Sequence, residues 1–118
     1  YGIDCSEKAN EIEYYLRMLK LEDKVKIVDN SFTTIDLSTG QKKRLALLIS
    51  LVEDKSIYLF DEWAADQDPH FRKYFYEDIL PELKKKGKCV IAITHDDRYF
   101  DIADHHIKFE FGKMCYIK

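Results

Sequence analysis

The chain contains Leu-Ser-Thr-Gly-Gln at residues 37–41, Ile-Tyr-Leu-Phe-Asp-Glu at residues 57–62 and Thr-His at residues 94–95. The first segment precedes a strongly apolar stretch, and each of the other two closes a short apolar run. Short apolar runs of this kind are typical of buried strands in a parallel sheet. The three segments therefore predict an α/β fold that places Asp61 and Glu62 at the carboxyl edge of the sheet, where open α/β sheets bind ligands.

Two helices are expected before the first strand of this sheet. Apolar residues recur at i, i+4 and i+7 from Ile12, and Ser6 is a suitable N-cap for that helix. Ser38 and Thr39 supply caps for a second helix over residues 40–53, which is apolar nearly all round. A helix of that kind is expected inside a domain.

The strand pattern is simple. Residues 56–60 and 88–94 are expected as buried strands of the parallel sheet. Between the first two helices, residues 25–35 predict an irregular or hairpin-like connector. Near the end of the chain, residues 107–109 are expected to pair with residues 115–117 in a hairpin.

A third helix is expected between the two parallel strands. Asp68 followed by Pro69 is a typical helix start, and Pro81 should kink or divide the helix. Gly87 marks its end. The apolar stripe of this helix consists of Phe71, Phe75 and Ile79.

Composition narrows the class of protein. The chain of 118 residues fits one small domain or part of a larger one. Its 19 basic and 22 acidic residues give a net charge of -3, which disfavours nucleic acid as a partner. Three scattered cysteines without Cys-x-x-Cys spacing argue against a disulfide framework or a structural zinc site. No apolar run approaches the roughly 20 residues that would cross a bilayer.

Taken in order, these segments resemble the second half of an ABC-type ATPase cassette, the C-terminal part of a P-loop NTPase fold. The resemblance implies a helical subdomain over residues 1–54 and the second half of the ATPase core over residues 55–118. Asp-Glu-Trp-Ala-Ala-Asp-Gln-Asp-Pro at residues 61–69 looks like bacterial exporters of cyclic peptides, peptide siderophores and microcin-like peptides.

Residues 38–41 would contact a nucleotide held by another cassette. A helix N-terminus offers free N–H groups and partial positive charge, and a glycine there allows close approach of an anion. The resemblance implies that Ser38, Gly40 and Gln41 contact the γ-phosphate of the partner's ATP, with Thr39 in place of the commoner glycine. The alternative reading of these four residues is an ordinary helix cap.

The two acids and the histidine have roles implied by the same resemblance. Asp61 would hold Mg²⁺ through water, and Glu62 would polarise the water that attacks the γ-phosphate. His95 would bond a γ-phosphate oxygen and orient that water. Alternatively, the acids are loop residues and His95 is a structural residue at a strand end. Asp96 and Asp97 are expected to cap the following helix, although one of them could orient the imidazole.

The loop after the catalytic acids would cross a dimer interface. Ala65, Asp66, Gln67 and Asp68 occupy the position that does so in the family, where Asp68 supports the partner's site. The same Asp68 can also cap the third helix. Trp63 stands where the family commonly has proline.

The expected function is ATP binding and hydrolysis in an exporter. No stretch of the 118 residues matches Gly-x-x-x-x-Gly-Lys-Ser/Thr, so the chain alone is expected to be inactive. The resemblance implies ATP and Mg²⁺ as ligands, a head-to-tail partner cassette, a transmembrane domain, and a place on the cytoplasmic side of the bacterial inner membrane. The alternatives are a head fragment of a soluble DNA-repair or chromosome ATPase, and a non-catalytic half-cassette that completes a partner's site.

Overall fold

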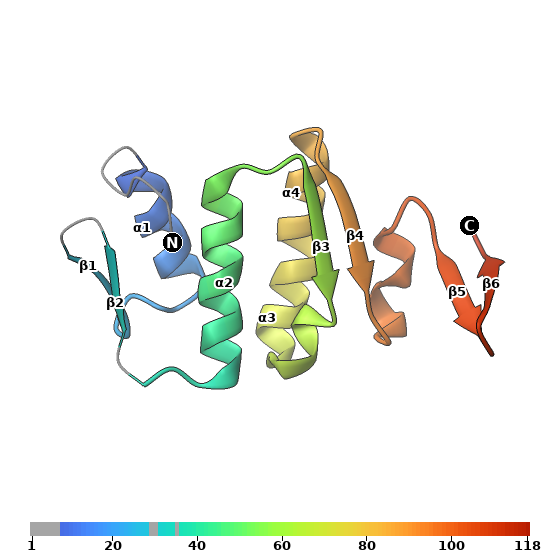
Figure 1. Ribbon diagram of the computed structural model, residues 1–118, viewed down its shortest axis with the longest axis horizontal. Helices are drawn as coiled ribbons and strands as arrows, with labels where there is room; N and C mark the ends of the chain where they lie inside the picture. Colours follow the sequence, from blue (N-terminus) through green and yellow to red (C-terminus); the bar gives the residue numbers. More distant parts are fainter. Residues whose placement is uncertain (1–7, 29–30, 35) are drawn as a thin grey trace.

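The computed structural model describes residues 8–28, 31–34 and 36–118, which form a mixed α/β structure. Its elements lie in a row from the first helix to the terminal hairpin (Figure 1), and the principal extents are 49 × 29 × 23 Å. The radius of gyration is 15.6 Å, whereas a compact domain of this length has a value of about 13.5 Å. The chain is therefore extended, and it leaves much apolar surface uncovered.

The first helix and a small hairpin occupy one end of the row. Helix α1 (Ala9–Met18) has Lys8 at its N-cap position, and the expected cap Ser6 lies outside the described residues. Strands β1 (Val25–Val28) and β2 (Ser31–Thr34) pair antiparallel. The expected hairpin-like connector is confirmed for the described residues, although residues 29, 30 and 35 lie outside them.

Helix α2 (Thr39–Glu53) is the central helix, as expected. Ser38 is its N-cap in a capping box: Gln41 N donates to Ser38 Oγ at 3.2 Å, and Ser38 N donates to Gln41 Oε1 at 2.9 Å. Thr39 is the first helical residue rather than a second cap. The buried side chains of α2 are Leu45, Leu47, Leu48, Ile49, Leu51 and Val52.

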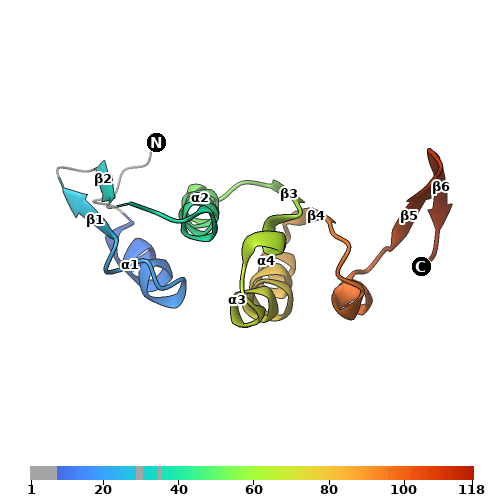
Figure 2. The same ribbon diagram turned by 90° about the horizontal axis from the view of Figure 1, so that it is seen from below.

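The two apolar runs form the expected parallel pair, β3 (Ile57–Asp61) and β4 (Cys89–Ile93). Figure 2 shows the helical segment after β3 lying on one side of this pair. Tyr58 and Phe60 are buried on that side. The expectation of buried strands holds for Tyr58 and Phe60 of β3 only: no residue of β4 is buried, and no described element covers the other face of the pair. The side chains exposed there are Ile57, Leu59, Ile91 and Ile93.

The helical segment after β3 has three parts: α3 (Pro69–Tyr74), a π-helical turn η2 (Phe75–Ile79) and α4 (Leu80–Lys85). The expected cap is confirmed, because Phe71 N donates to Asp68 Oδ1 at 3.0 Å. The π turn ends at Ile79, two residues before Pro81, which has no N–H to donate. The expected interruption near Pro81 is thus a wider helical turn. Gly87, with φ of 77°, follows the helix end.

Short elements complete the chain. The 3₁₀ helix η1 (Trp63–Asp66) follows β3, and the 3₁₀ helix η3 (Asp97–Ile102) follows β4. Strands β5 (Ile107–Glu110) and β6 (Lys113–Tyr116) form the expected terminal hairpin, which is exposed on both faces. Within the described parts of the chain, every helix is too short or too polar to span a bilayer.

An aromatic cluster joins the sheet to the helices. The ring of Phe75 stacks on Trp63 with centroids 4.5 Å apart, and it meets Phe60 and Tyr76 edge-on, each at 5.0 Å. All four side chains are buried. Aromatic pairs in these arrangements add to the stabilisation that burial alone provides. Phe75 therefore connects β3, η1 and the helical segment in one core.

We expect Phe75→Ala to lower the free energy of unfolding of the chain by about 3–5 kcal/mol, because it opens a cavity among three rings. Phe111→Ala is the matched control, since the Phe111 side chain is fully exposed. Urea denaturation followed by circular dichroism measures both variants. Equal shifts of the two midpoints would contradict the central place of Phe75 in the core.

Candidate functional site

Two strand ends bring the predicted catalytic residues together. Asp61 is paired in register with Ile93, and Glu62 N donates to Ile93 O at 2.8 Å. The pairing of β3 with β4 therefore continues one residue beyond the end of β3. As a result, Glu62 and His95 emerge at the same carboxyl edge of the sheet, as the sequence predicted.

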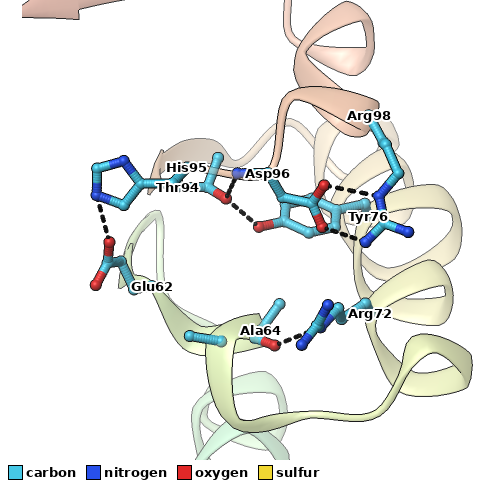
Figure 3. Close-up of a pocket in the computed structure, with 9 residues that line it drawn as sticks. Glu62, Ala64, Arg72, Tyr76, Thr94, His95, Asp96 and Arg98 are labelled. Carbon is cyan, nitrogen blue, oxygen red and sulfur yellow. Dashed lines mark hydrogen bonds and ion pairs between the residues drawn. The ribbon is translucent and has the colours of Figure 1, made fainter.

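Glu62 and His95 contact each other directly, with His95 Nε2 2.8 Å from Glu62 Oε1 (Figure 3). An ionised carboxylate can only accept a hydrogen bond, so in that state of Glu62 the Nε2–H of His95 is the donor. The His95 side chain is 92% exposed and that of Glu62 is 42% exposed. Both groups can thus reach a ligand at the sheet edge without rearrangement of the core.

The backbone of Glu62 has an unusual conformation. Its φ of 53° and ψ of 38° lie in the left-handed region, which costs an L-residue about 1–2 kcal/mol. Three hydrogen bonds hold it there: the bond to Ile93 O, one from Ala65 N at 3.2 Å and one from Lys43 Nζ at 3.3 Å, the last two to the Glu62 carbonyl. Strain kept at a polar site by surrounding contacts is a frequent feature of functional sites.

A pocket of about 370 Å³ opens beside this pair, lined in part by Arg72, Tyr76 and Thr94. Tyr76 OH donates to Thr94 Oγ1 at 2.8 Å, and the same oxygen accepts from Asp96 N at 3.0 Å (Figure 3). Burial raises the pKa of Tyr76, which keeps its hydroxyl protonated and able to donate. These contacts fix the turn that carries His95 out of β4.

Asp96 does not act as the sequence predicted. Its carboxylate accepts two hydrogen bonds from Arg98, from Nε at 2.9 Å and from Nη2 at 3.0 Å, and it caps no N–H of η3. Arginine and carboxylate match geometrically in this bidentate arrangement, which a capping bond cannot equal. The group that contacts the His95 imidazole is instead Glu62.

Residues 38–41 form the N-terminal turn of α2, with Ser38 and Thr39 exposed and Gly40 and Gln41 half-buried. The Gly40 backbone lies close to the loop after Glu62, because a Cβ at Gly40 would stand 3.0 Å from Asp66 O. The absence of a side chain at Gly40 thus permits close packing of α2 against that loop. The predicted signature and the predicted interface loop are in contact within one chain.

Residues 65–68 divide into exposed and buried positions. Ala65, Asp66 and Asp68 are exposed, whereas Gln67 is only 3% exposed. Gln67 Nε2 donates to Gly40 O at 3.0 Å, and Gln67 Oε1 accepts from Arg44 Nη1 at 2.8 Å. Gln67 therefore faces its own α2.

Three cations that hold this loop were not identified from the sequence. Lys43 and Arg44 reach it from α2, and Arg72 Nε donates to Ala64 O at 3.2 Å and to Gln67 O at 2.9 Å. Lys43 and Arg44 stand at i+3 and i+4 from Gly40, the spacing that places residues on one helix face. That spacing could have indicated from the sequence that Lys43 and Arg44 lie on the same face of α2 as Gly40.

The acids at the sheet edge fit a magnesium ion bound with a nucleotide. Asp61 is exposed at the end of β3 and lies next to Glu62. Mg²⁺ is commonly bound through one or two carboxylates, waters and substrate phosphates rather than by a cage of protein ligands. Among the described residues, no cluster of three or more His, Cys, Asp or Glu could hold a metal ion by itself.

The structure as a whole defines a class of protein. A mixed α/β chain with a parallel strand pair, an acidic strand end and a histidine on the adjacent strand has the organisation of part of an ABC-type P-loop NTPase cassette. The family model described as "ABC transporter" matches residues 4–65, just over half of the chain. The chain belongs to the ABC transporter family, as its sequence predicted.

Individual relatives agree with this assignment. The chain is 55% identical over 105 residues to "ATP-binding protein SyrD" of Pseudomonas syringae pv. syringae, covering 88% of the chain and 19% of that protein. It is 35% identical over 117 residues to "Energy-coupling factor transporter ATP-binding protein EcfA2" of Mycoplasmoides gallisepticum, covering 96% and 34%. It is 32% identical over 113 residues to "Putative hemin import ATP-binding protein HrtA" of Staphylococcus aureus, covering 96% and 49%. The chain thus spans between 19% and 49% of the length of these relatives.

The Arg98–Asp96 pair gives a prediction for titration. Hydrogen bonding from Arg98 lowers the pKa of Asp96, so the stabilisation is present above the unfolded-state pKa and is lost as pH falls through the folded-state pKa. We expect Arg98→Met to raise the pKa of Asp96 toward its ordinary value of about 3.9. NMR titration of the Asp96 carboxyl carbon measures this value. Arg17→Met, which removes an exposed pair with Glu13, should leave it unchanged, and an unmoved pKa in Arg98→Met would contradict the assignment.

Proposed function

We propose that this chain is the C-terminal part of the ATP-hydrolysing cassette of a bacterial exporter. The observation that carries the proposal is the contact of Glu62 with His95 at the carboxyl edge of a parallel strand pair, in a chain of the ABC transporter family. A carboxylate and an imidazole held together on neighbouring strands can both act on one bound water and one phosphate.

In the proposed reaction, Glu62 is the catalytic base and His95 a phosphate ligand. A carboxylate oxygen of Glu62 accepts a proton from water as the water oxygen bonds to the γ-phosphorus of ATP and the bond from that phosphorus to ADP breaks. The imidazole of His95 donates to a γ-phosphate oxygen and orients the water. Asp61 would hold Mg²⁺ through water, and the metal supplies positive charge opposite the phosphates.

The remaining site residues act on a second nucleotide. Ser38, Thr39, Gly40 and Gln41 would contact the γ-phosphate held by a partner cassette in a head-to-tail pair. Exposure of Ser38 and Thr39 at a helix N-terminus supports this role, because that position presents N–H donors and partial positive charge.

The crossing loop would meet the same partner. Ala65, Asp66 and Asp68 are exposed and available to it, with Asp68 also capping α3. Buried Gln67 would support the loop from within. This division of labour within residues 65–68 follows from which side chains face solvent.

The uncovered face of the β3–β4 pair is proposed to pack against an earlier part of the same cassette. Four aliphatic side chains are exposed there on two adjacent strands, and exposed apolar side chains that gather in one place often mark a surface that another segment or protein covers. The fraction of each relative that the chain matches supports a longer protein. Within it, residues 1–54 would belong to a helical subdomain and residues 55–118 to the ATPase core.

Export is the finer part of the proposal. The 55% identity to "ATP-binding protein SyrD" and the sequence of residues 61–69 support a place among peptide or siderophore exporters. The cassette would then dock on a transmembrane domain at the cytoplasmic side of the bacterial inner membrane. The net charge of -3 disfavours nucleic acid as a partner.

Glu62→Gln tests the proposed hydrolysis. We expect this variant of the full-length protein to lose at least about 100-fold in the kcat of ATP hydrolysis, because an amide cannot accept the proton. Glu77→Gln, at an exposed acid outside the site, should stay within about twofold of wild type. Phosphate release measures both rates.

The same assay applies to the 118-residue chain, which we expect to show no turnover. Hydrolysis in the full-length protein that survives Glu62→Gln would favour a non-catalytic half that completes a partner's site. A Glu62-dependent rate from the chain alone would overturn its proposed inactivity.

Leu59→Asp tests the proposed covering of the sheet face. In the 118-residue chain the side chain is exposed, so the variant should cost about 1 kcal/mol or less. In the full-length protein it would bury an unpaired charge and should cost about 3 kcal/mol or more. Thermal melting of both proteins, with Leu59→Ile as the apolar control, measures the difference. Equal losses in the two would show that nothing covers this face.

A further inference from the structure

Helix α2 reaches the catalytic loop through Lys43. The ammonium group of Lys43 lies 2.6 Å from Asp66 Oδ2 and donates to the Glu62 carbonyl at 3.3 Å. The backbone carbonyl of the same residue accepts from Trp63 Nε1 at 3.0 Å. Lys43 therefore contacts three residues of the loop over residues 62–67: Glu62, Trp63 and Asp66.

Lys43 contacts Glu62 at its backbone carbonyl oxygen, which helps to set the backbone conformation of that residue. Glu62 has a left-handed backbone, and its carbonyl accepts from both Lys43 Nζ and Ala65 N. A bond to that carbonyl restrains ψ of Glu62 and thereby the orientation of the Glu62 Cα, to which the side chain is attached, relative to the loop that follows. Lys43 thus bears on where the Glu62 carboxylate points.

The exposure of the Lys43–Asp66 ion pair favours a role in positioning the loop over one in stabilising the fold. The Lys43 side chain is 32% exposed and that of Asp66 is 45% exposed, so solvent screens the charge pair and limits its contribution to stability. What the pair does supply is a direct contact between α2 and η1, beside the Lys43 bond to the Glu62 carbonyl. The adjacent Lys42 is exposed, and its side chain makes no hydrogen bond or ion pair among the described residues.

A second set of contacts ties the same helix to the other end of the loop. Gln67 bridges the Gly40 carbonyl and Arg44, and the Gly40 backbone lies against Asp66. The first two turns of α2 therefore hold residues 62–67 at both ends. A shift of the α2 N-terminus cannot occur without a shift of this loop or a loss of these bonds.

We propose that Lys43 is a positioning residue for Glu62, through which a phosphate bound at the N-terminus of α2 sets the geometry of the catalytic carboxylate in the same chain. The inference rests on the proposed function, since it needs both the phosphate contact of Ser38 and the catalytic role of Glu62. The chain thereby couples two nucleotide sites: one that its α2 touches, and one that its Glu62 serves.

Lys43→Met in the full-length protein tests this role, with Lys42→Met as the matched control. We expect Lys43→Met to lower the kcat of ATP hydrolysis about tenfold while the KM for ATP changes less than about threefold, because binding groups stay in place and only the base is displaced. Lys42→Met should stay within about twofold of wild type in both. Lys43→Arg retains a cation able to reach Asp66 and should recover kcat to within about threefold.

The outcomes separate the two proposals. If Glu62→Gln leaves hydrolysis intact, Glu62 is not the base and both proposals fall. If Glu62 is essential but Lys43→Met behaves like Lys42→Met, the proposed function stands and the positioning role is overturned. A loss in Lys43→Met that is not recovered by Lys43→Arg, and that comes with a lower melting temperature, would show a merely structural role and would also overturn it.

Discussion

The left-handed backbone of Glu62 depends on restraint from two sides. On one side β4 accepts the amide of Glu62 through Ile93 O, and on the other α2 donates to its carbonyl through Lys43. Without both partners an L-residue would relax to a commoner conformation, since the left-handed region costs about 1–2 kcal/mol. The carboxylate then would not meet His95 at the sheet edge. The geometry of the site therefore rests on parallel pairing and on the position of α2 together.

The aromatic core supports the same restraint. The Trp63 indole packs on Phe75 with its ring and donates its N–H to Lys43 O at the edge of the core. A proline at this position could fill space but could not donate, so the tryptophan adds a link between core and α2. Because Phe75 also contacts Phe60 of β3, the strand, the loop and the helix share one packed cluster. Stability of the core and precision of the site are thus connected.

Local patterns determined much of what the sequence could predict. The capping box of Ser38 and Gln41, the cap at Asp68 and the two parallel strands follow from residues close in sequence. The contacts of Lys43 with Glu62 and of Gln67 with Gly40 join residues 19 and 27 positions apart. Such contacts depend on how the helix docks against the sheet, and no local pattern encodes that. Likewise, apolar alternation predicted buried strands, but burial of the second face requires a covering element that the described residues do not supply.

The position of Lys43 suggests how the two nucleotide sites of the proposed cassette pair would be coupled. In a head-to-tail pair, the N-terminus of α2 and the carboxylate of Glu62 in one chain would face different nucleotides. Because the two are rigidly connected, a nucleotide bound at one site would change how favourable the catalytic position of Glu62 is at the other. By thermodynamic linkage, each nucleotide would then change the affinity of the other by the same factor. Rigid contact is sufficient for this coupling, because Gly40, Lys43 and Gln67 leave little room for α2 to move independently of the loop. Two such chains, each holding the partner's phosphate and its own catalytic base, would therefore favour states in which both nucleotides are bound.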